Sequence, residues 1–253
     1  MVPVTFEPLP LGSIKPEGWL HDQLGLMSDG LAGHEYDFYH YVHDSSWLGG
    51  NSEYSSLNEG FPYWFNGLVA LAYGLDDARL KTQVLNAASY VLGHQQTDGW
   101  LGPETTNSTR DLWGRFPFFL GLYQLIEADP TQAPTTIPAM YKFINLMHGM
   151  LIDNVGFTQF WGQVRYQDMM ITLQWLYEKH PVDSGNDNKQ LLMETMYLLK
   201  QRSYDWSQYY NKDVFIFEDL DLIQPAITGD SAIFPFVHGV NTGQGKHSIS
   251  SET

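Results

Sequence analysis

The chain has 253 residues, of which 43% are hydrophobic, and its 13 basic and 29 acidic side chains give a formal net charge of -16. This balance excludes a basic stripe for nucleic-acid phosphates and disfavours an anionic membrane surface, and no apolar run is long enough to cross a bilayer. Cysteine is absent, which excludes disulfides, thiol nucleophiles and cysteine-ligated zinc within these residues.

The first residues predict little regular structure. Residues 1–15 are expected to form an extended segment, and they lack the basic and apolar regions of a signal peptide. Pro16 favours a helix that begins just after it. The apolar face of that helix is Trp19, Leu20, Leu24 and Met27. Residues 30–59 have no helical period and are rich in Gly, Ser and Asn, so a long loop is expected there.

The middle of the chain alternates between two kinds of predicted helix. Residues 61–75, 112–128 and 163–179 are apolar nearly all round, which is typical of helices buried on every side. One-sided apolar stripes follow them in residues 80–92, 140–151 and 191–199. Asp76 or Asp77 can cap the first of these amphipathic helices and Thr136 the second.

This alternation predicts an all-α fold, an (α/α)6 toroid in which outer helices wrap a ring of inner ones. The inner helices are expected to begin near Gly60, Leu112, Gly162 and Phe236, a period of about fifty residues. Residues 1–253 are expected to form a single toroidal domain that ends before the ring closes, because six hairpins need about twelve helices. An open ring would expose apolar inner helices, which favours self-association.

The longer connections lead into the inner helices and hold most of the Trp, Asp and Glu residues. Long connections in compact domains usually carry function, so the site is expected on this face. Aromatic faces mixed with carboxylates suit a carbohydrate. The candidate residues are Glu59, Trp64, Asn66, Asp98, Trp100, Trp113, Arg115, Trp161, Arg165, His238 and Asn241. Of these, six are expected to line one concave site: Trp64, Trp100, Trp113, Arg115, Trp161 and His238.

The carboxylates have structural alternatives. Glu59 is the candidate acid or base, since glycoside hydrolysis usually uses two carboxylates, and its alternative role is to cap the helix that begins at Gly60. Asp98 precedes a glycine, and a turn is the favoured interpretation.

The charged residues near the helix starts, Arg115, Arg165 and Asp168, also have a structural alternative. A buried ion pair that orders the rim is favoured over catalysis for these three. No metal is assigned, because the histidines of the long loop lack metal-ligand spacing. They are His34, His40 and His43.

Five short motifs occur in an order that resembles the β-L-arabinofuranosidase-like glycoside hydrolases of the six-hairpin glycosidase superfamily, particularly the fungal members. The motifs are PLGSIKPEGWL at 10–20, NEGFPYWFNG at 58–67, QTDGWLG at 96–102, WGR at 113–115 and HGVN at 238–241. The resemblance implies an (α/α)6 catalytic domain, a carbohydrate substrate attacked at its non-reducing end with retention, and an extracellular location.

The same resemblance implies a zinc-bound cysteine nucleophile and a glutamate acid/base downstream of the segment that resembles His238. Because this chain has no cysteine, those roles are not carried over, and no cofactor is assigned to the chain itself. His238 matches a sugar-contacting histidine by motif. The chain is thus expected to be the N-terminal part of a catalytic domain, inactive alone on β-L-arabinofuranosides.

Two further functions stay open. One is a catalytically inactive carbohydrate-binding relative, which the missing nucleophile favours. The other is a terpene-cyclase-like toroid, because residues 96–100 resemble the Gln-Trp repeats of those proteins. Against the second, the sequence has no Asp-Asp-rich motif.

Overall fold

The computed structural model of the chain describes residues 8–206 and 238–249. These residues are mostly helical, which confirms the all-α class. Within them, the sheet structure is one short antiparallel pair, β1 (Val182–Asp183) and β2 (Asn186–Asp187), with Val182 opposite Asp187.

The N-terminal part is more helical than the sequence predicts. Residues 8–18 contain turns but no helix, and α1 (Trp19–Asp29) then follows the proline as expected. The predicted loop at 30–59 is wrong, since it contains α2 (Leu31–Phe38), α3 (His40–His43) and the 3-10 turn η1 (Ser46–Leu48). The physical reason is tertiary: the Arg79 guanidinium donates to the carbonyl oxygens of Ser28 at 3.1 Å and Gly33 at 2.8 Å, which fixes the junction of α1 and α2.

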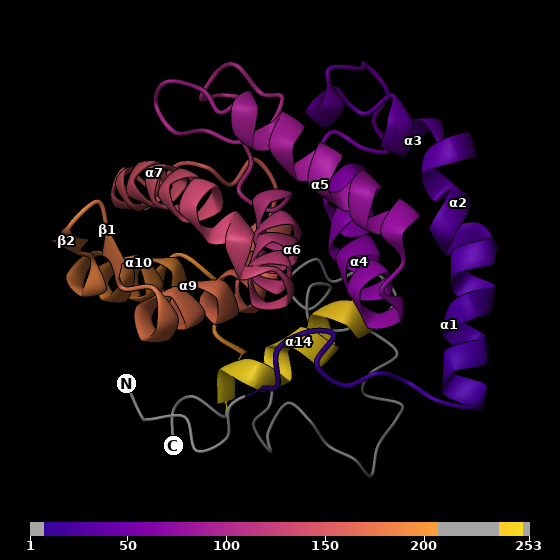
Figure 1. The fold of residues 1–253 in the computed structure, drawn as a ribbon. Coiled ribbons are helices and arrows are strands. Elements are labelled where there is room, and N and C mark those ends of the chain that lie inside the picture. Colours follow the sequence, from indigo (N-terminus) through magenta and orange to yellow (C-terminus); the bar gives the residue numbers. More distant parts are fainter. Residues whose placement is uncertain (1–7, 207–237, 250–253) are drawn as a thin grey trace, which may run out of the picture.

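Three helices form an inner row. They are α4 (Gly60–Leu75), α6 (Arg115–Ala128) and α9 (Gln167–Lys179). Figure 1 shows α6 between α4 and α9, and it packs against both. The backbones of α4 and α6 approach closely at Gly121, where a Cβ atom would stand 2.6 Å from the Phe65 ring. Phe65 and Phe118 pack nearby with tilted rings whose centroids are 5.0 Å apart, so aromatic contacts also join α4 to α6.

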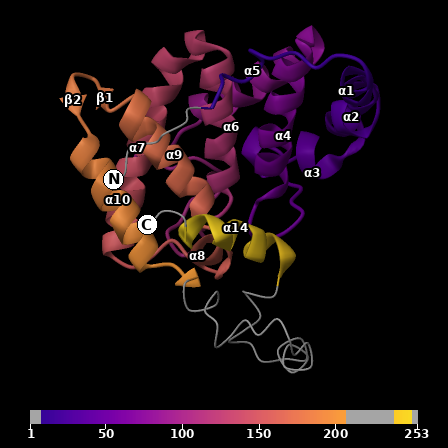
Figure 2. The ribbon, with the colours of Figure 1, turned by 90° about the horizontal axis from the view of Figure 1, so that it is seen from below.

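Three more helices form an outer row. They are α5 (Ala78–Gly93), α7 (Ala133–Ile152) and α10 (Lys189–Gln201). Helix α5 packs on α4, while α10 packs on α7 and α9 (Figures 1 and 2). On the side of α4 away from α6 lie α1 and α2, and α14 (Gly239–Ile249) packs against α9. Closure of these rows into an (α/α)6 toroid stays a prediction.

The predicted first residues of the helices agree with the structure at some positions and differ at others. Helix α4 begins at Gly60 as predicted, and Asp77 caps α5 by accepting from the backbone N–H groups of Arg79 and Leu80. Helix α6 begins three residues after Leu112. The start near Phe236 lies outside the described residues.

Two predicted boundaries need correction. The helix expected at 163–179 is broken at Arg165 into α8 (Trp161–Val164) and α9. Thr136 is not the cap of α7, because it is buried inside that helix. Instead Asp129 caps the 3-10 turn η2 (Pro130–Gln132), which leads directly into α7. Among the described helices, none is both long and apolar enough to span a membrane.

Candidate functional site

Two adjoining cavities open around the first turn of α4. The polar chamber, of about 370 Å³, is lined by Tyr54, Ser55, Ser56, Leu57, Glu59, Gln159, Trp161, Arg165 and His238. The apolar chamber, of about 480 Å³, lies between α1, α2 and α4. Both are bordered by Tyr54, Glu59 and Arg165, so they lie side by side, and the two chambers together are called the cleft.

Glu59 presents its carboxylate to this cleft. It occupies the position before α4, but its side chain makes no capping hydrogen bond to that helix, so the capping alternative is wrong. Instead, its Oε2 accepts a 2.6 Å hydrogen bond from the indole Nε1 of Trp113. Trp113 is buried, and a short bond from a buried donor to a carboxylate is strong and orienting. Asn58 turns the chain into α4 with a φ of 52°, a conformation that Asn tolerates better than most residues.

Arg165 forms the opposite wall of the polar chamber. Its guanidinium lies 4.9 Å from the ring centroid of Trp113 and 4.8 Å from that of Trp161. Its Nε donates to Asn241 Oδ1 at 2.7 Å, and its Nη1 donates to the Tyr63 hydroxyl at 3.1 Å. Arg165 is only 7% exposed, and within the described part of the chain no carboxylate forms a salt bridge with it. The expected ion pair with Asp168 is therefore absent there, and indole faces and neutral oxygens stabilise the charge.

Tyr63 and Asp168 complete the charged surroundings. Burial raises the pKa of Tyr63 to about 12, although the Arg165 charge lowers it, so the phenol stays protonated at neutral pH. Burial also raises the pKa of Asp168 to about 6, against the opposing effects of a 2.8 Å hydrogen bond from Gln244 and the charge of Arg165. Carboxyl groups with raised pKa values near a cleft are typical of functional sites.

His238 enters the polar chamber from the residue before α14. Its ring meets Trp161 edge to face, with centroids 5.6 Å apart. Its Nδ1 is buried and finds no hydrogen-bond partner among the described residues. Across the chamber, Gln159 donates to the Ser56 hydroxyl at 3.1 Å. The chamber therefore combines donors, acceptors and an indole ring from three separate segments.

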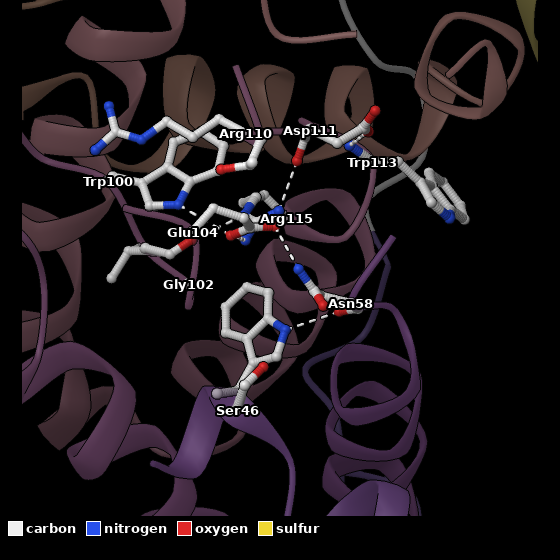
Figure 3. A network of polar contacts seen from close by, with 12 residues as sticks. Ser46, Asn58, Trp100, Gly102, Glu104, Arg110, Asp111, Trp113 and Arg115 are labelled. Atoms are coloured by element: carbon white, nitrogen blue, oxygen red, sulfur yellow. Dashed lines mark hydrogen bonds and ion pairs between the residues drawn. The ribbon is translucent and has the colours of Figure 1, made fainter. Parts of the chain in front are cut away.

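A second polar network lies beside the cleft, inside the protein. Arg115 and Glu104 form an ion pair there, and neither Arg115 nor Trp100 has any exposed surface. Figure 3 shows Trp100 and Asn58 converging on Glu104: Trp100 Nε1 donates to Oε2 at 3.1 Å and Asn58 Nδ2 donates to Oε1 at 2.7 Å. The expectation that Trp100 and Arg115 contact substrate is wrong, because burial leaves them no surface to do so.

The surroundings of Arg115 explain this burial. Its Nε donates to the Leu101 carbonyl at 2.8 Å and its Nη1 to the Asp111 carbonyl at 2.6 Å. The guanidinium also lies over the rings of Trp47 and Trp100. At Gly102, with a φ of 128°, a Cβ atom would collide with the guanidinium. The structural alternative for Arg115 is thus confirmed, and through Asn58 the network holds the residue that precedes Glu59.

The other predicted residues take supporting places. Asp98 accepts from the backbone N–H of Trp100 and pairs with Arg110 at 2.7 Å, which confirms its turn role. Asn66 accepts from Gln124 of α6 and lines neither chamber. Five predicted residues line the cleft: Glu59, Trp64, Trp161, Arg165 and His238. Two others are fully buried and line neither chamber, so the expectation that they contact substrate is wrong, and they support the cleft from behind: Trp113 and Asn241.

The sequence interpretation missed several contributors to the cleft and its support, two of which are Tyr63 and Glu104. Tyr63 lies one helical turn after Glu59, and this i, i+4 spacing could have placed both on one face. Glu104 lies in a loop, and no sequence signal joins it to Arg115.

The zinc centre implied by the family resemblance does not fit these residues. The chain has no cysteine, and residues 8–206 and 238–249 contain no group of three or more His, Asp or Glu side chains placed to hold a metal ion.

Comparisons of the chain with protein-family models, with curated proteins and with solved structures gave no match.

Proposed function

We propose that this chain forms the sugar-binding cleft of a glycoside hydrolase of the β-L-arabinofuranosidase-like type. The observation that carries the proposal is the convergence of Glu59, Arg165 and His238 on one chamber, beside the indole ring of Trp161. These side chains come from the start of α4, the α8–α9 break and the residue before α14, so the fold brings together three residues that are far apart in the sequence.

The chamber matches the chemistry of a small sugar. Sugar hydroxyls both donate and accept hydrogen bonds, and the chamber offers an acceptor in Glu59 and a buried cation in Arg165. The Trp161 indole, which Arg165 and His238 also contact, is the apolar surface proposed to meet the C–H face of the sugar. A volume of about 370 Å³ lies within the range of roughly 300–1,000 Å³ usual for small-ligand sites.

Glu59 is the residue proposed for acid–base work. Its carboxylate is fixed by Trp113 and reaches the cleft, as a group that exchanges a proton at a bound sugar must. Asp168 is proposed as a positioning residue, because it interacts electrostatically with Arg165 and lines neither chamber. The cysteine chemistry implied by the resemblance finds no residue in this chain, so the proposal for these 253 residues is sugar binding with Glu59 at the reacting end.

The test is a titration of the purified chain with methyl β-L-arabinofuranoside, followed by calorimetry and by the indole N–H signals of the tryptophans in NMR spectra. We expect saturable binding that Glu59→Gln weakens by about tenfold or more, because a hydrogen bond to a charged group contributes roughly 1.5–3 kcal/mol. The control is Glu194→Gln, an exposed carboxylate on α10.

Absence of saturable binding by the folded chain, or equal binding by the wild type and Glu59→Gln, would refute the sugar site. An aryl-glycoside hydrolysis assay runs in parallel. Turnover by the chain that Glu59→Gln abolishes would place the chemistry in these residues, whereas binding without turnover would identify a sugar-binding part only.

A further inference from the structure

A largely buried tryptophan forms part of the wall of the apolar chamber. Trp64 is 6% exposed and lines this chamber. Its Nε1 is covered by protein and has no hydrogen-bond partner among the described residues. The wall around it is otherwise largely hydrophobic, with Met27, Ala32, Leu68 and Leu71.

The apolar chamber adjoins the proposed sugar site. Tyr54, Glu59 and Arg165 border both chambers, so a ligand that extends past Glu59 from the polar chamber would enter the apolar one. The polar chamber offers charged and hydrogen-bonding groups, whereas the wall of the apolar chamber is largely hydrophobic, although Glu35, Glu59 and Arg165 also border it. This polarity suits a ligand with a hydroxylated end and an apolar end.

We propose that the apolar chamber binds the aglycone of the glycoside, and that this aglycone is an uncharged aryl or alkyl group rather than a further sugar of a polysaccharide. The proposal rests on the sugar site proposed above. Two carboxyl groups, Glu35 and Glu59, lie on the chamber wall and disfavour an anionic aglycone.

Gly67 offers a way to fill the chamber without touching the sugar site. It lies on α4 at the chamber wall, and a Cβ atom there would meet nothing within 4 Å. Gly67→Leu therefore places a side chain into open space and also favours the helix, since Gly is a poor helix former. The matched control is Gly149→Leu on α7, where a Cβ atom also meets nothing within 4 Å.

The experiment compares the binding of methyl, phenyl and octyl β-L-arabinofuranosides to the wild type and to both variants. We expect the wild type to bind the phenyl and octyl glycosides roughly tenfold or more tightly than the methyl glycoside, since each buries apolar surface. Gly67→Leu should remove this preference and leave methyl glycoside binding unchanged, while Gly149→Leu should alter neither. The indole N–H signal of Trp64, assigned with Trp64→Phe, should shift with the phenyl glycoside.

Methyl glycoside binding reports on the sugar site alone, so the two proposals fail separately. If the methyl glycoside binds but the phenyl and octyl glycosides bind no more tightly, the aglycone proposal is overturned and the sugar site stands. If Gly67→Leu keeps the full preference, the aglycone binds elsewhere and the proposal is also overturned. If no glycoside binds, the proposed function fails first.

Discussion

Removal of the Glu104 carboxylate should destabilise the fold severely. Arg115 has no exposed surface, and Glu104 is its ionic partner. Glu104→Ala leaves a buried guanidinium without its counter-charge, which typically costs about 3–5 kcal/mol. The same change leaves the indole N–H of Trp100 and the amide of Asn58 without their acceptor, so the upper part of that range is expected.

The assay is urea unfolding followed by tryptophan fluorescence and by circular dichroism. The matched control is Glu194→Ala, whose side chain is 50% exposed and lies 3.5 Å from His148, so its loss should cost less than about 1 kcal/mol. Equal effects of the two substitutions, or a loss below about 1 kcal/mol for Glu104→Ala, would refute the assignment of this network as the structural support of the site.

Three other predictions concern stability. The pKa of Asp168 rises from 3.8 to about 6 in the fold, so the stability that its protonated carboxyl contributes is fully present below pH 3.8 and is lost as the pH rises through about 6. Asp168→Asn should therefore stabilise the chain at pH 7.5 by up to roughly 3 kcal/mol and change its stability little at pH 3.5. Urea unfolding at both pH values measures this difference. Asp77→Ala should cost about 1 kcal/mol by removing the cap of α5, and because the bond from the Leu80 N–H lowers the pKa of Asp77, the loss should shrink in acid. Gly121→Ala should cost about 1–3 kcal/mol because its Cβ would meet the Phe65 ring at 2.6 Å, whereas the thermal midpoint of Gly149→Ala should not fall.

The helices that the sequence predicts well are those whose burial is visible in their own residues. Residues 61–75 are apolar all round and residues 80–92 on one side, and the structure gives α4 and α5 nearly these bounds. The cap at Asp77 could also be predicted, because an Asp just before an amphipathic stripe accepts hydrogen bonds from the first backbone N–H groups of the helix. By contrast, α2 is short and is fixed by Arg79 from another helix, which no local pattern reveals.

The candidate site was predictable in position but not in side-chain direction. Glu59 and Arg165 reach the cleft as expected, since both lie where inner helices begin. Trp100 follows the same loop pattern as Trp161, yet its side chain points into the protein, where it donates to Glu104 and packs against the Arg115 guanidinium. Such a pairing depends on how the loop folds back, and spacing along the chain does not encode it.

A crystal structure of the chain with methyl β-L-arabinofuranoside would test the central claim most directly. The account predicts a sugar ring in the polar chamber, with hydroxyl groups within hydrogen-bond distance of the Glu59 carboxylate and the His238 ring, and with one face on the Trp161 indole. A sugar bound at another surface while this chamber holds only solvent, or one that makes no contact with Glu59, would contradict it.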